Sequence, residues 1–139
     1  MKFVLDSNIL ISALNLNDVF NEEAAAVAEV SNRNNFEVIA PVLHLWELEA
    51  YLRHTVKSTT HVPNSDLKLK VTTYDVTSGL FTRTYKSDLA CVKGADRVFV
   101  SLAMDHDCPL VTNDEQIHKY ADIFGIKTIY ASDFVAEKF

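Results

Sequence analysis

The sequence contains only three glycines and two cysteines, and these small numbers argue against several kinds of site. With so few glycines, the chain can hardly form a glycine-rich loop that binds nucleotide phosphates. The cysteines, Cys91 and Cys108, belong to no Cys/His ligand pattern, which argues against zinc. They form no motif with each other either, so we expect a reducing intracellular compartment, the cytoplasm.

Long apolar runs and an excess of positive charge are also missing. No apolar stretch approaches the roughly 20 residues that a membrane span needs, and the first residues do not have the pattern of a secretory signal. The net charge of −6 at first sight disfavours a polyanionic partner. Apolar residues nevertheless make up 48% of the 139 residues, so we predict a single domain, residues 1–139, with a substantial core.

The hydrophobic pattern alternates between short strands and helices along the chain. The predicted strands are residues 2–5, 36–40, 67–71, 108–112 and 126–130. The predicted helices are residues 18–32, 42–56, 78–86, 95–105, 114–121 and 132–138, and residues 57–65 have the composition of a loop. This alternation predicts an α/β sandwich around a mostly parallel sheet of five strands.

Acidic residues lie at the carboxyl ends of two of the predicted strands. Asp6 comes after the first strand, and Asp114 follows the end of the fourth. Glu47 lies about one turn into the helix after the second strand, and Asp96 lies in the first turn of the helix before the fourth. Open α/β sheets bind ligands outside the carboxyl ends of their strands. If the first and fourth strands are neighbours, we expect all four acids to share one rim.

Four carboxylates in one place repel each other, which disfavours their ionisation. A hard divalent cation such as Mg²⁺ or Mn²⁺ offsets this repulsion, because these ions prefer oxygen ligands. A metal held in this way activates water and stabilises the charge that develops on a phosphodiester. The pattern therefore indicates a metal-dependent nuclease, with Asp6, Glu47, Asp96 and Asp114 as metal ligands and catalytic residues.

At these residues the sequence resembles the PIN domain family, which includes the VapC-type ribonuclease toxins. The matching stretches, in chain order, are VLDSNILIS, APVLHLWELEAYL, KGADRVFVSLAMDHDCPLVTNDEQI and GIKTIY. The resemblance implies a PIN-like three-layer α/β/α sandwich whose acidic quartet binds Mg²⁺ or Mn²⁺ for RNA cleavage. It also implies polar residues that border the quartet, namely Ser7, Asn8, Thr112 and Asn113.

We therefore expect an endoribonuclease in which metal-bound water attacks the phosphodiester, and the resemblance implies a 5′-phosphate product. It also implies a toxin of a toxin–antitoxin pair, with an antitoxin and a second copy of the chain as partners besides RNA. The segment between the Glu47 helix and the third strand is short for the family, which puts those protein contacts in doubt more than the catalysis. A catalytically quiet protein-binding module and a metal-dependent DNA nuclease or phosphatase remain alternatives.

Each acid also has a simpler interpretation. Asp6 and Asp114 occupy positions typical of helix N-caps, and the helix dipole favours Asp96 in a first turn. Glu47 competes with Glu49, and we prefer Glu47 because its W-E-L context matches the family.

The other polar and aromatic residues receive ordinary structural interpretations. The histidines, His44 among them, are predicted on the surface or on helix faces, and Trp46 is predicted in the core. Phosphate contacts are expected from among Arg53, Lys57, Lys68, Lys70, Arg83, Lys86, Lys93 and Arg97.

Overall fold

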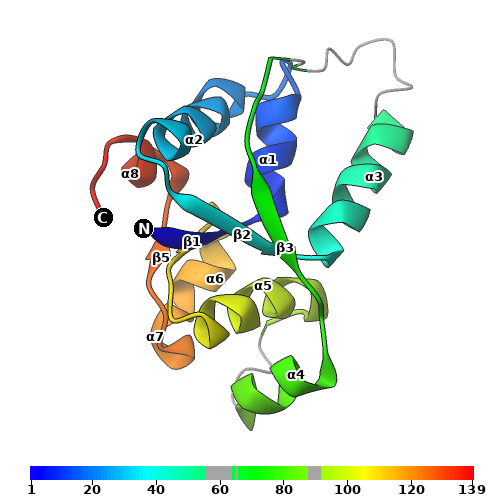
Figure 1. Cartoon of the computed structure of the whole chain (residues 1–139), viewed down its shortest axis with the longest axis vertical. Helices are drawn as coiled ribbons and strands as arrows, with labels where there is room; N and C mark the ends of the chain where they lie inside the picture. Colours follow the sequence, from blue (N-terminus) through cyan, green and yellow to red (C-terminus); the bar gives the residue numbers. More distant parts are fainter. Residues whose placement is uncertain (56–63, 65, 88–91) are drawn as a thin grey trace.

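Five parallel strands form the central sheet of the computed structural model, which describes residues 1–55, 64, 66–87 and 92–139 (Figure 1). The strands are β1 (Lys2–Leu5), β2 (Glu37–Pro41), β3 (Val71–Tyr74), β4 (Leu110–Val111) and β5 (Thr128–Ile129). Every neighbouring pair is parallel, which confirms the predicted sheet. The loop predicted at residues 57–65 lies outside the described residues apart from Asn64, and so do Lys57 and Cys91.

Helices cover both faces of the sheet, which confirms the three-layer sandwich (Figure 1). In the described ranges they are α1 (Ser7–Leu14), α2 (Asn21–Arg33), α3 (Leu43–Thr55), α4 (Ser78–Thr84), α5 (Gly94–Asp105), α6 (Glu115–Lys119), α7 (Ala121–Phe124) and α8 (Ala131–Val135). None of these helices combines the length and the apolar character that spanning a membrane requires, as far as the described residues go.

Alternate residues of β1 contribute to two separate cores. Phe3 and Leu5 point to the side of α1, α2 and α8, where the Phe3 ring packs 4.8 Å from the ring of Phe134. Val4 points to the other side and packs among residues of α5 and β4, including Leu102. Successive side chains of a strand point to opposite faces, so this short buried strand holds both helix layers.

One strand prediction is shifted from its true position. The predicted strand 67–71 overlaps β3 only at Val71, because β2 pairs with residues 71–74. Leu67 and Leu69 are partly buried against the core although they lie outside the sheet. The alternation of leucine and lysine there reflects one-sided burial of an extended segment and not strand pairing.

The order of the strands creates a topological switch point beside β1. The order across the sheet is β3-β2-β1-β4-β5. The chain therefore adds β2 and β3 on one side of β1, and then β4 and β5 on the other side. Leu5, the last residue of β1, lies in register with Val111, the last residue of β4. The residues that follow these two strands therefore emerge next to each other at the carboxyl edge, where ligands of such sheets bind.

Candidate active site

Asp6 connects β1 to α1 and caps that helix. Its backbone N–H donates to the carbonyl of Val111 at 3.0 Å, which continues the contact between β1 and β4. Its carboxylate oxygen Oδ1 accepts a hydrogen bond from the N–H of Asn8 at 3.2 Å. The N-cap interpretation is thus correct, although the predicted helices do not include α1. Asp6 is only 7% exposed, and capping uses just one of its two oxygens.

Thr112 connects Asp6 to Asp114. Its buried hydroxyl donates to Oδ2 of Asp6 at 2.7 Å and accepts from the N–H of Asp114 at 3.0 Å. Asp114 in turn caps α6, because its Oδ1 accepts from the N–H of Gln116 at 2.8 Å. The two aspartates expected to share one rim therefore do so, with a single hydroxyl between them.

A short chain of polar side chains orients Glu47. The hydroxyl of Ser7 donates to Oε1 of Glu47 at 3.3 Å and lies 3.2 Å from Nδ1 of His44. If the one hydroxyl hydrogen goes to Glu47, the contact with Ser7 requires the His44 tautomer that carries a proton on Nδ1. Burial lowers the pKa of His44, which favours the neutral ring.

One prediction about the side chains of α3 is wrong, because Trp46 is 69% exposed and not part of the core. His44 lies on a helix face, one of the two positions predicted for it, but that face is buried and His44 is only 2% exposed. The spacing of three residues between His44 and Glu47 places both on one side of the helix, a sequence pattern that could have indicated their shared role. Glu49, the competing acid, forms an exposed ion pair with Arg53 at 2.9 Å, which leaves Glu47 directed at the site.

Asp96 joins the group from the first turn of α5. Burial is the largest cause that raises the pKa of its carboxyl group above the ordinary value. Repulsion from Asp114 and from Asp6 raises that pKa further, whereas the cation of Lys93 lowers it. An acid far from the others along the chain therefore experiences their charges in the fold.

The pKa values of Asp6 and Glu47 are raised for the same reasons. Burial is again the largest cause for both, and the hydrogen bonds described above act in the opposite direction. Repulsion from Asp114 adds to the pKa of Asp6, and repulsion from Asp6 and Asp96 adds to that of Glu47. The four predicted site acids thus form one electrostatically coupled group.

The donor set of this group suits a hard divalent cation. Its members are carboxylates, the ligand type that Mg²⁺ and Mn²⁺ prefer. Among the described residues, no three His, Cys, Asp or Glu side chains already form a ligand set around one point. Mg²⁺ keeps several of its waters and takes only one or two carboxylates directly, so these residues fit such an ion.

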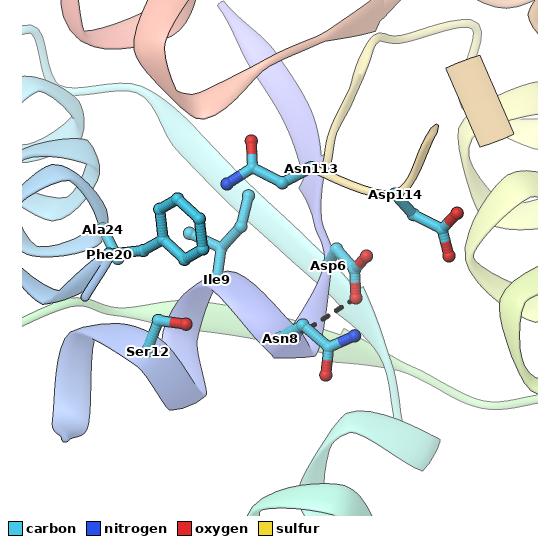
Figure 2. A pocket seen from close by; sticks show the side chains of 8 residues that line it. All are labelled: Asp6, Asn8, Ile9, Ser12, Phe20, Ala24, Asn113 and Asp114. Carbon is cyan, nitrogen blue, oxygen red and sulfur yellow. Dashed lines mark hydrogen bonds between the residues drawn. The ribbon is translucent and has the colours of Figure 1, made fainter. Parts of the chain in front are cut away.

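Two hollows flank Asp114 at this edge of the sheet. The first, about 230 Å³, is shown in Figure 2 and is lined by Asp6, Asn8, Ile9, Ser12, Phe20, Ala24, Asn113 and Asp114. The second, about 340 Å³, is lined by Val92, Lys93, Asp96, Asp114, Gln116 and Ile117. Among the predicted supporting residues, Asn8 and Asn113 line the first hollow, whereas Ser7 and Thr112 are buried. Asp114 therefore borders both hollows, Asp6 and Asp96 each border one, and Glu47 lines neither.

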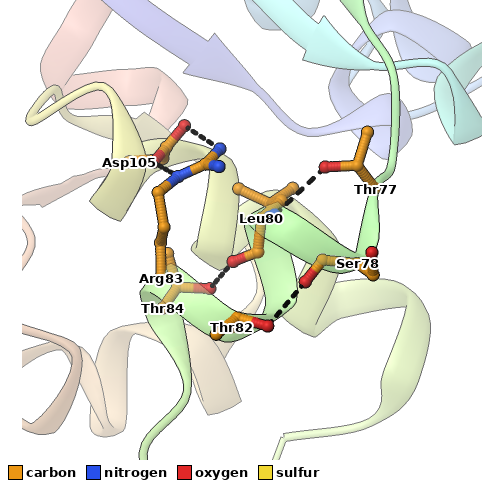
Figure 3. A network of polar contacts seen from close by, with 7 residues as sticks. All are labelled: Thr77, Ser78, Leu80, Thr82, Arg83, Thr84 and Asp105. Atoms are coloured by element: carbon orange, nitrogen blue, oxygen red, sulfur yellow. Dashed lines mark hydrogen bonds and ion pairs between the residues drawn. The ribbon is translucent and has the colours of Figure 1, made fainter.

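Lys93 is the predicted phosphate contact that lines one of these hollows, beside Asp96. Two other predicted contacts already have acidic partners. Arg83 donates two hydrogen bonds to Asp105, at 2.8 and 3.1 Å (Figure 3), and Arg53 is paired as described above.

Comparisons with known proteins agree with the sequence resemblance. A family model described as the PIN domain matches residues 3–123. A crystal structure of VapBC2 from Rickettsia felis bound to a DNA fragment from their promoter has a TM-score of 0.64, with 17% identity over 94% of this chain and 98% of that chain. A PilT N-terminus domain protein from Sulfolobus solfataricus P2 has a TM-score of 0.55, with 12% identity over 100% of this chain and 94% of the other. No curated protein matches the sequence significantly.

Proposed function

The chain belongs to the PIN domain family, and on this premise we propose that it is a Mg²⁺- or Mn²⁺-dependent endoribonuclease. PIN domains are typically nucleases, and this proposal adds the substrate, the metal and the residues. The proposed ligands are Asp6, Glu47, Asp96 and Asp114, supported by Ser7, Asn8, Thr112 and Asn113. We propose that residues 1–139 form a single nuclease domain.

The observation that supports the proposal best is the placement of four partly buried acids together at the carboxyl edge of the sheet, where their charges repel one another. Such an arrangement is unfavourable without a counter-charge. A bound Mg²⁺ or Mn²⁺ ion would supply that charge, together with an activated water for phosphodiester hydrolysis.

The protein's own side chains orient the acids for this role. Thr112 holds Asp6 relative to Asp114, and Ser7 holds Glu47, in each case through a hydroxyl with little or no exposure. Hydrogen bonds behind a set of ligands limit how far the ligands must move when an ion binds. Lys93 contacts a phosphate of the substrate, and we expect the binding of RNA to be weak and sensitive to salt.

Cleavage of single-stranded RNA tests this function. Purified protein is incubated with the RNA in Mn²⁺ or in EDTA, alongside Asp6→Asn, Glu47→Gln and the matched control Glu49→Gln. We expect 5′-phosphate products from the wild type and the control in Mn²⁺, and none in EDTA or from the two site variants. Cleavage that persists in Asp6→Asn or in EDTA would show that the site is assigned wrongly.

Parallel substrates separate the alternatives that use the same site. Single-stranded DNA, flap DNA and a phosphomonoester test for a DNA nuclease or a phosphatase. If none of the substrates reacts and calorimetry detects no Mn²⁺ binding, the chain is a catalytically quiet protein-binding module.

We also propose an antitoxin-type partner, since the similar Rickettsia felis structure is a VapBC2 assembly, and a homodimer, which the sequence resemblance implies. Co-purification with the product of a neighbouring reading frame tests the first contact. Sedimentation of the chain alone tests the second, and a monomer at all concentrations contradicts it.

A further inference from the structure

The hollow beside Asp6 and Asp114 has one acidic side and one apolar side. Figure 2 shows the two aspartates on one side and the ring of Phe20, close to Ile9, on the other. Ile9 is itself buried, so Phe20 is the large apolar side chain that reaches from this wall into solvent. The wall therefore presents one aromatic ring next to the proposed site of phosphodiester cleavage.

Phe20 is 55% exposed, although exposing such a large apolar surface to water is unfavourable. Its ring nevertheless sits on a well-fixed turn. The backbone N–H of Phe20 donates to Oδ1 of Asp18 at 2.8 Å, and Oδ2 of Asp18 accepts from the hydroxyl of Ser12 at 3.2 Å. Both oxygens of one carboxylate thus tie this turn together and to α1.

Asn21, the next residue, fixes the other side of the same turn. Its side-chain amide donates to the carbonyls of Ser12 and Ala13, at 3.0 Å each, and the residue is buried. The backbone on both sides of Phe20 is therefore held against α1. An exposed ring on a fixed turn is suited to bind a flat ligand at a low cost in conformational entropy.

We infer that Phe20 stacks against a base of the single-stranded RNA, at the nucleotide next to the phosphate that is cleaved. This inference rests on the proposed function, and it identifies Phe20 as a residue that positions the RNA substrate. A hollow of about 230 Å³ lies below the roughly 300–1,000 Å³ of small-molecule pockets, which favours one part of a longer ligand. Aromatic stacking supports binding of any base, so we expect this contact to confer little sequence preference.

The polar groups around the ring are suited to the remaining edges of a nucleotide. The side-chain amide of Asn8 makes no hydrogen bond to the described part of the chain, so it is available to a base or a ribose. Asn113 is fixed instead, because its Oδ1 accepts from the N–H of Ala131 at 3.0 Å. The side-chain amide of Asn8 is thus open to a ligand, whereas the side chain of Asn113 is held by its hydrogen bond to Ala131.

The test compares Phe20→Ala, the conservative variant Phe20→Tyr and the matched control Val19→Ala. Val19 belongs to the same turn and is 87% exposed, but it does not line the hollow. Binding of a fluorescent single-stranded RNA is measured by anisotropy with Ca²⁺ in place of Mn²⁺, and kcat and KM are measured separately with Mn²⁺. We expect Phe20→Ala to raise Kd and KM about tenfold with kcat unchanged, and the other two variants to match the wild type.

A second measurement locates the stacked base. RNAs with a single abasic nucleotide at successive positions should bind the wild type less tightly at one position, and this loss should disappear in Phe20→Ala. Equal Kd and KM for wild type and Phe20→Ala overturn the stacking role, and the exposed ring then serves a protein contact or the turn alone. If the wild type itself neither binds nor cleaves RNA, the proposed function fails first and the inference fails with it.

Discussion

Replacing Asp6 by Asn separates the charge of this side chain from its role as a helix cap. An Asn side chain can still accept the N–H of Asn8 through its amide oxygen, because Asn and Asp are equally good N-caps. Its amide nitrogen cannot accept the hydroxyl of Thr112 as Oδ2 does, and we expect the relief of repulsion to offset this lost hydrogen bond. The substitution removes a negative charge that burial and the nearby Asp114 make unfavourable. We therefore expect the melting temperature of the metal-free protein to stay the same or to rise.

With a divalent cation, the wild type should have a higher melting temperature than Asp6→Asn. An ion at 100 times its Kd stabilises the folded state by about 2.7 kcal/mol. For a chain of 139 residues, 1 kcal/mol corresponds to roughly 3 °C, so the wild type should gain about 8 °C. A hundredfold loss of affinity in Asp6→Asn would reduce the gain to about 0.4 kcal/mol, or roughly 1 °C.

Thermal unfolding in EDTA and in Mn²⁺ measures both effects. Asp122→Asn is the matched control, since Asp122 is exposed on α7 and lines neither hollow beside the acids. If Asp6→Asn melts several degrees below the wild type in EDTA, the hydrogen bonds of Asp6 matter more than its charge, and our reasoning is wrong. Equal gains in Mn²⁺ for the wild type and Asp6→Asn would place the ion elsewhere.

Two further predictions concern the metal-free protein. Thr112→Val keeps the shape of the side chain but leaves Oδ2 of Asp6 and the N–H of Asp114 without their partner, so urea unfolding should show a loss of about 1–3 kcal/mol that Thr112→Ser avoids. The second concerns pH. Folding raises the pKa of Asp6 above its ordinary value of 3.8. Between the pKa of the unfolded chain and that of the folded protein, the folded protein binds more protons. The free energy of unfolding therefore falls as pH rises through this window. Any advantage of Asp6→Asn over the wild type at neutral pH should therefore shrink on acidification through this window; an advantage that grows instead would contradict the sign.

Much of the fold could be predicted because hydrophobic periodicity is a local property. The apolar residues before Asp6 indicate a buried strand, and the structure places β1 there. The prediction misses α1, although Asp6, Ile9 and Ala13 have the spacing of a capped helix with a buried face. Local patterns were thus sufficient to predict most elements, and the pattern that indicates α1 was present but was not used.

The error on Trp46 and the unexpected burial of His44 have a different origin. Composition alone favours Trp46 in the core and His44 outside it. Burial depends instead on which side of the helix faces the sheet, and the hydrogen bond to Ser7 makes a buried His44 acceptable. A helix whose apolar residues surround it on several sides does not reveal this orientation by itself.

By itself, the sequence determined the alternation of strands and helices and the position of each acid relative to its own element, because both depend on neighbouring residues. Only the tertiary structure decided that β1 lies beside β4, and hence that Thr112 connects Asp6 to Asp114. That contact joins residues 106 positions apart, and it depends on the order of strands across the sheet, which no local pattern encodes. The raised pKa values of the acids follow from the same packing, because burial and mutual repulsion exist only once distant segments meet.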